Sequence, residues 1–142
     1  MKRRESLLRL KRFRVDDLKR RTATLDGMQA DVTRKLSDLE DSVVRERQRA
    51  NDSDIGRLAF PSFLRAMDTR RENLRATLKE IERERVQAEV ELGEAHQNVK
   101  ILELAAEQEA KRAAETQLRK SGIDFDEFAL GRHPRKHALR QG

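Results

Sequence analysis

A seven-residue repeat of apolar side chains runs along most of this chain and constrains its fold more than any other feature. In the second half the repeat runs from Phe60 to Ala113 and is apolar except at Arg71, Arg85 and Glu109. A heptad repeat kept over this length predicts helices that wrap around one another in a left-handed coiled coil. The first half carries the same repeat, with Thr22 and Gln29 in its polar gaps and Lys11 as its charged member; its apolar members are Leu8, Val15, Leu18, Leu25, Val32, Leu36, Leu39 and Val43.

The composition agrees with long helices and disagrees with a compact globule. Of the 142 residues, 41% are charged, 36% are hydrophobic and only 4% are aromatic. A globular core of this length needs more apolar and aromatic volume, whereas the narrow seam between two helices needs less. Two prolines and six glycines are also too few for the many turns of a β protein. We therefore expect an all-α fold.

Turn-forming residues separate the two repeats, which predicts an antiparallel hairpin over residues 1–120. We expect a helix over residues 5–50, a turn over residues 51–60 and a helix over residues 61–119. Gly56 can supply a positive φ in the turn, and Pro61 suits the first position of the second helix.

The predicted register follows from the position of the turn. With the turn centred near Ile55, the numbers of facing residues add up to about 110, so Val32 faces Leu78 and Leu36 faces Leu74. Arg71 then lies opposite Leu39, and Arg85 opposite Leu25. Charges at seam positions reduce stability but help to set the register, or their long side chains reach out to the edge of the seam.

The end of the chain differs from the hairpin. Ser121 and Gly122 are typical of a helix C-terminus, so we expect the second helix to end near Lys120. Residues 121–142 are then a basic, flexible tail. Residues 103–119 extend the second helix past the start of the first and have no predicted partner within the chain.

No group of residues forms a catalytic or metal site in this pattern. A two-helix hairpin offers no cleft in which a nucleophile and a base could be held, so we expect no enzyme activity, cofactor or small-molecule substrate. The chain has no cysteine, and Pro134 separates His133 from His137, so we expect no metal site. Asp52 and Asp54 are interpreted as turn formers.

Basic residues are concentrated at the start of the chain. The antiparallel arrangement would place them at the same end as the extension of the second helix, forming a basic pole. A charge run of this kind is most often a solvated helix face, but it also suits nucleic acid phosphates, an anionic membrane surface or an acidic protein ring. The absence of tyrosine and tryptophan counts against binding of single-stranded nucleic acid. The residues of this pole that we consider for partner binding are Arg3, Arg4, Arg9, Lys11, Arg12 and Arg14.

An aromatic cluster follows the turn at the opposite pole. Phe60, Leu64 and Met67 occupy seam positions and close that end of the hairpin. Phe63 lies outside the repeat, so we expect it to be exposed, either as an isolated apolar side chain or as the mark of a docking patch.

The chain resembles the FliJ family of small flagellar type III export proteins over about residues 5–120. The resemblance rests on the run from Leu7 to Val15, on the pair Glu46 and Arg47 before the turn, and on two unbroken helices joined by one short turn. It implies a two-helix antiparallel coiled coil similar to the central stalk of rotary ATP synthases.

The resemblance also implies partners and a location. Members of the family associate with the hexameric export ATPase, couple it to the export gate, a membrane protein, and recycle export chaperones. The basic pole would then dock in the ATPase ring. The gate-docking pattern of the family is an aromatic residue followed by residues at +4, +7 and +11, and Phe60, Leu64, Met67 and Arg71 match that spacing. Such a protein is cytoplasmic and peripheral at the cytoplasmic face of the inner membrane; the sequence has neither a signal peptide pattern nor an apolar run that could span a bilayer.

Two other functions remain open from the residues alone. A basic coiled-coil hairpin could bind nucleic acid through phosphates, and its binding would then fall steeply as salt is added. A plain oligomerisation module would instead self-associate through the stripe of residues 103–119, with no dependence on the basic pole.

Overall fold

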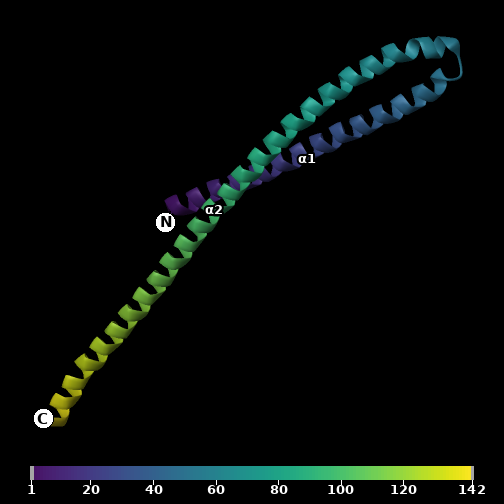
Figure 1. Cartoon of the computed structure of the whole chain (residues 1–142). Coiled ribbons are helices and arrows are strands. Elements are labelled where there is room, and N and C mark those ends of the chain that lie inside the picture. Colours follow the sequence, from purple (N-terminus) through teal and green to yellow (C-terminus); the bar gives the residue numbers. More distant parts are fainter. Residues whose placement is uncertain (1, 142) are drawn as a thin grey trace. The chain divides into compact units, whose positions relative to one another are not determined.

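The computed structural model contains two helices, α1 (Lys2–Ala50) and α2 (Asp54–Gln141), joined by a short turn (Figure 1). The structure describes the backbone of residues 2–141 and the side chains of residues 2–123 and 125–129. Over that range it contains no strand, which confirms the all-α prediction. No described helix combines the length and the apolar character needed to cross a membrane.

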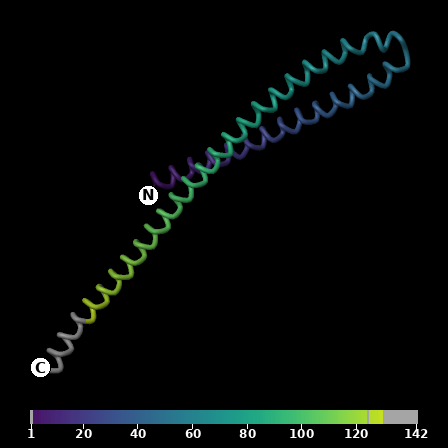
Figure 2. Tube along the Cα trace, viewed as in Figure 1, coloured from purple at the N-terminus to yellow at the C-terminus, as the bar shows by residue number. Residues whose placement is uncertain are grey.

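The chain divides into two units, and each has its own packing. Unit 2 is Arg9–Gln97 and contains the turn; unit 1 is Met1–Leu8 together with Asn98–Gly142. In unit 2 the two helices run side by side in opposite directions, as Figure 2 shows. Unit 2 is therefore the antiparallel hairpin that the heptad repeat predicts.

The core of unit 2 consists of the repeat residues. Leu25 is completely buried and forms a cluster with Val32, Ile81 and Ala88. Leu36, Leu74 and Leu78 pack against this cluster, in agreement with the predicted register. Burial of such residues supplies most of the stability of a paired helix, because isolated helices are marginal in water. The other buried side chains of the seam are Val15, Leu18, Leu39, Val43, Ala50 and Ala95.

The turn is tighter than predicted because α2 begins at Asp54 rather than at residue 61. The Ser53 hydroxyl caps this helix by accepting a hydrogen bond from the Gly56 N–H at 2.9 Å. At the other side of the turn, the Arg57 guanidinium donates to the Asn51 carbonyl at 3.3 Å, just beyond the end of α1. Pro61 consequently lies inside α2, where it has no N–H to donate.

Gly56 is required because the start of α2 comes close to the end of α1 there, and not because its φ is positive. No described glycine has a positive φ. A Cβ atom at residue 56 would lie 2.8 Å from the Ser53 Oγ and 3.0 Å from the Ala50 Cα, so the start of α2 fits against the end of α1 only with glycine there. The predicted positive φ of Gly56 was wrong. The residue still determines the turn, through the close packing of the two helices.

The predicted end of α2 near Lys120 was also wrong. The helix passes through Ser121 and Gly122 and ends at Gln141. Gly122 has no positive φ, so it does not form the expected C-terminal cap. Side chains of residues 130–142, including the basic ones, lie outside the described residues, and the flexibility of residues 121–142 stays a prediction.

In unit 1 the first residues of α1 pack against α2. Arg4 forms an ion pair with Glu109, and Leu8 and Ala106 contribute to a shallow groove of about 360 Å³ between the two segments. Ala106, Ala110 and Ala113 of α2 line this groove with Arg4 and Leu8, so the start of α1 partly covers the alanine-rich face of α2. Every residue of α2 beyond Ala106 whose side chain is described is nevertheless exposed.

Candidate protein-binding surfaces

The predicted basic pole is divided between the two units. Arg3 and Arg4 belong to unit 1, and Arg9, Lys11, Arg12 and Arg14 belong to unit 2.

Several charges of the pole are engaged within the protein. In unit 1, Arg4 is half-buried and pairs with Glu109. In unit 2, Arg14 lies 3.8 Å from Glu91 of α2, and Lys11 is half-buried in the seam. These contacts leave a smaller free positive charge than the sequence alone suggests.

Two large apolar side chains lie exposed within the basic stretch of unit 2, and sequence reasoning missed them. Leu10 and Phe13 are 62% and 61% exposed. The guanidinium of Arg20 lies 5.9 Å from the centre of the Phe13 ring, a distance suited to a cation–π contact. Their positions outside the heptad repeat were the available signal. Basic and apolar groups together are typical of a surface that binds another protein.

The four residues predicted to dock the export gate lie along the face of α2 that packs on α1. Phe60, Leu64, Met67 and Arg71 are all half-buried. The guanidinium of Arg47 from α1 lies 5.7 Å from the centre of the Phe60 ring. Each of these side chains therefore has a structural role within the hairpin, and its remaining exposed area is available to a partner.

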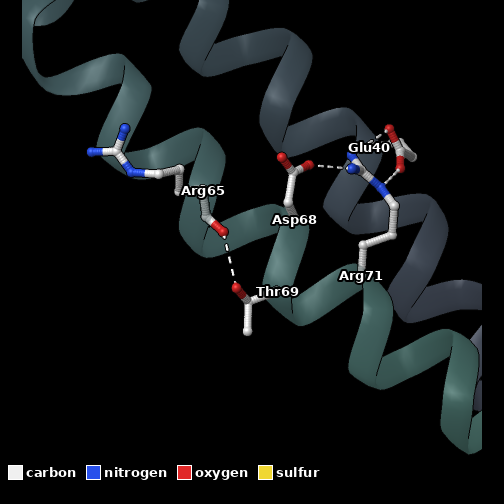
Figure 3. A network of polar contacts seen from close by, with 5 residues as sticks. All are labelled: Glu40, Arg65, Asp68, Thr69 and Arg71. Carbon is white, nitrogen blue, oxygen red and sulfur yellow. Dashed lines mark hydrogen bonds and ion pairs between the residues drawn. The ribbon is translucent and has the colours of Figure 1, made fainter.

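Arg71 is the most strongly engaged of the four (Figure 3). Its Nε lies 2.5 Å from one Glu40 oxygen, its Nη2 lies 3.2 Å from the other, and its Nη1 lies 2.5 Å from Asp68. The hydrogen bond to Glu40 is the main cause that raises the pKa of Arg71, and Asp68 adds to it, while partial burial acts in the opposite direction. Stability from this contact is present in full below the unfolded pKa of the guanidinium and is lost only as the pH rises through the higher folded pKa.

Arg85 repeats the arrangement of Arg71 two heptads further along α2. Its Nε lies 2.9 Å from Asp26, and its Nη1 donates to the Gln29 amide oxygen at 3.0 Å. Both arginines were predicted to face a leucine of α1. Each instead reaches the acidic residue that follows that leucine, because its long side chain extends to the edge of the seam.

The hairpin tip contains a groove that sequence reasoning missed. It has a volume of about 280 Å³. Its lining combines the small or apolar residues Ala50, Ile55, Gly56, Ala59, Phe60 and Phe63 with the polar residues Glu46, Arg49 and Ser53. Phe63 is half-buried rather than exposed, because its ring centre lies 6.3 Å from that of Phe60. The sequence signal for this groove is the pair of small residues Gly56 and Ala59, which lie one helical turn apart. The prediction of a turn over residues 51–60 concealed it, because that spacing has no meaning outside a helix.

Comparison with known proteins is consistent with this architecture. None of the curated proteins matches the chain, and no solved structure does either. One family does match, the flagellar FliJ protein family, over residues 1–138. Because that match covers nearly the whole chain, the protein, a two-helix coiled-coil hairpin, belongs to the flagellar FliJ protein family and has a role related to flagellar export.

Proposed function

We propose that the protein is a non-enzymatic coupling and escort protein of the flagellar type III export apparatus. It docks its basic N-terminal segment in the hexameric export ATPase and links the ATPase to the export gate and to export chaperones. It does so in the cytoplasm, at the cytoplasmic face of the inner membrane. The family match over residues 1–138 carries this proposal.

The structure supports a protein partner for the basic segment of unit 2. A surface that binds only phosphates needs cations, and exposed apolar side chains add nothing to that binding. Leu10 and Phe13 are exposed between Arg9, Arg12 and Arg14, so this segment offers both apolar anchors and positive charge. That combination favours an acidic protein recess over nucleic acid.

The deciding experiment measures ATP hydrolysis by the export ATPase with and without this protein. We expect stimulation by the wild type and its loss in a variant with Arg9→Glu, Arg12→Glu and Arg14→Glu. The matched control makes the same change of charge on exposed residues of α2, with Arg75→Glu, Lys79→Glu and Arg83→Glu, and should stimulate as the wild type does. Equal loss in both triple variants would mean that net charge matters and that the N-terminal segment does not.

Nucleic acid binding is the second candidate function, supported by the net charge of +6. Fluorescence anisotropy with labelled double-stranded DNA tests it, because phosphate contacts weaken binding steeply between low and physiological salt. Strong, salt-sensitive DNA binding without any stimulation of the ATPase would replace the coupling proposal.

The proposed gate contact is tested separately. We expect Phe60→Ala to weaken binding of the cytoplasmic domain of the export gate while stimulation of the ATPase persists, because Phe60 lies next to the turn and outside the basic N-terminal segment. Circular dichroism must show that the hairpin is intact. Unchanged gate binding in a folded variant would remove Phe60 from the contact.

A further inference from the structure

We propose that the groove at the hairpin tip binds an acidic segment of another protein and takes one large apolar side chain of that segment. The groove shares only Phe60 with the proposed gate contact, and this inference does not depend on the export role.

The shape and lining of the groove suit one apolar side chain. Its lining includes Ala50, Gly56 and Ala59, which carry little or no side chain, together with Phe63. Its volume of about 280 Å³ exceeds the roughly 150 Å³ of an apolar cavity that holds benzene. The groove is open to solvent, so a side chain of a partner can reach it.

Exposed apolar surface at the tip is greater than the fold of the hairpin requires. Ile55 lines the groove and is 82% exposed, and Leu58 in the same turn of α2 is 83% exposed. These are the two most exposed large apolar residues in the part of the chain whose side chains are described. Neither contributes to the seam, so packing within the hairpin does not explain them.

The charge beside the groove identifies the partner as acidic. On α1, Arg49 lines the groove, and Arg45 lies one turn away on the same helix face. On α2, Arg70 lies two turns beyond Phe63 on the same face, and it shares a surface depression with Ser42, to which Arg45 donates a hydrogen bond at 3.2 Å. Three arginines therefore follow one side of the hairpin from the groove.

Most of this positive charge is not neutralised within the hairpin. Arg49 pairs with Glu46 at 3.2 Å. Among the described residues, no carboxylate lies within ion-pair distance of Arg45 or Arg70. Two further acidic residues lie along this row: Asp38 lines the same depression as Lys35, and Asp41 lies one turn before Arg45 on α1. A segment with one large apolar residue and acidic residues beyond it would complement both the groove and the arginines.

An unbiased selection tests the chemistry of the partner. A phage library of short random peptides is selected on the full-length protein and counter-selected on Ala59→Leu, which fills the groove. Residue 59 is exposed on a helix and leucine is a good helix former, so this variant should fold, and circular dichroism verifies it. We expect the selected peptides to contain a large apolar residue with Asp or Glu nearby. Selected peptides that are basic, or that bind Ala59→Leu equally, would overturn the proposal.

Isoleucine methyl NMR then locates the selected peptide. The chain has only four isoleucines: Ile55 lines the groove, Ile81 is buried in the core, and Ile101 and Ile123 belong to unit 1. We expect the peptide to shift the Ile55 methyl signal and to leave the Ile81 signal in place. A response at Ile101 or Ile123 without one at Ile55 would contradict the assignment.

Matched variants separate the groove from the arginines. Ala59→Leu, and the pair Arg45→Glu with Arg70→Glu, should each weaken peptide binding about tenfold or more. Ala76→Leu, and the pair Arg75→Glu with Lys79→Glu, make matching changes at exposed positions of α2 away from the groove and should leave binding unchanged. Sedimentation velocity tests whether a second copy of this chain occupies the groove instead. Self-association of the wild type that is lost in Ala59→Leu would show that it does, and would refute the acidic partner.

Discussion

Replacing Leu25 with alanine should destabilise the hairpin far more than the same change at an exposed leucine of the same helix. Leu25 is 0% exposed and packs with Val32, Ile81 and Ala88. A buried Leu→Ala change costs about 2–5 kcal/mol, from the lost transfer of the side chain out of water and from the cavity that it leaves. Because only two helices surround the site and can relax inward, we expect the free energy of unfolding to fall by about 3 kcal/mol, in the lower half of that range.

The assay is thermal unfolding followed by circular dichroism at the helix band. For a chain of this size, about 3 kcal/mol corresponds to a fall in Tm of roughly 10 °C. The control is Leu10→Ala, because Leu10 is 62% exposed; its free energy of unfolding should change by no more than about 0.5 kcal/mol. Equal shifts in Tm for the two variants would show that the seam around Leu25 is not the stabilising core.

Three further perturbations probe other parts of unit 2. Ser53→Ala removes the cap on the Gly56 N–H and should lower the free energy of unfolding by about 1 kcal/mol in a urea titration; an unchanged midpoint would mean that the cap contributes nothing. Arg71→Glu should lower Tm by placing a carboxylate beside Glu40, and adding Glu40→Arg should restore much of that loss. An additive loss of Tm in the double variant would argue against the ion pair. Leu78→Asp buries a charge against the core cluster and should unfold the hairpin, so a normal melting curve would disprove the register.

The seam and its register could be predicted from the sequence because they depend on periodicity, which every heptad repeats. The packing of Leu36 and Leu74 against the core cluster follows directly from the spacing of the repeat and the position of the turn. Helix ends depend on single contacts instead. The start of α2 is determined by the Ser53 hydroxyl and by backbone contact at Gly56, and a glycine in a turn is equally consistent with a positive φ.

The candidate binding surfaces were less predictable because they depend on side chains outside the repeat. Phe63 was expected to be exposed, but its neighbour Phe60 partly covers it. The groove beside them exists because Gly56 and Ala59 are small, and the absence of a side chain leaves no periodic signal. The partners of Arg71 and Arg85 lie one residue beyond the predicted positions, since the length of an arginine side chain allows it to pass the facing leucine.

The two seam arginines prevent the helices of unit 2 from sliding past one another. A slip of one heptad in one direction would move Arg85 from Asp26 to Lys19, and a slip in the other would move Arg71 from Glu40 to Arg47. Either displacement replaces an ion pair with a repulsive pair of cations, and the other arginine would face Thr33. A lengthwise push on one helix of unit 2 is consequently transferred to the other without a change of register.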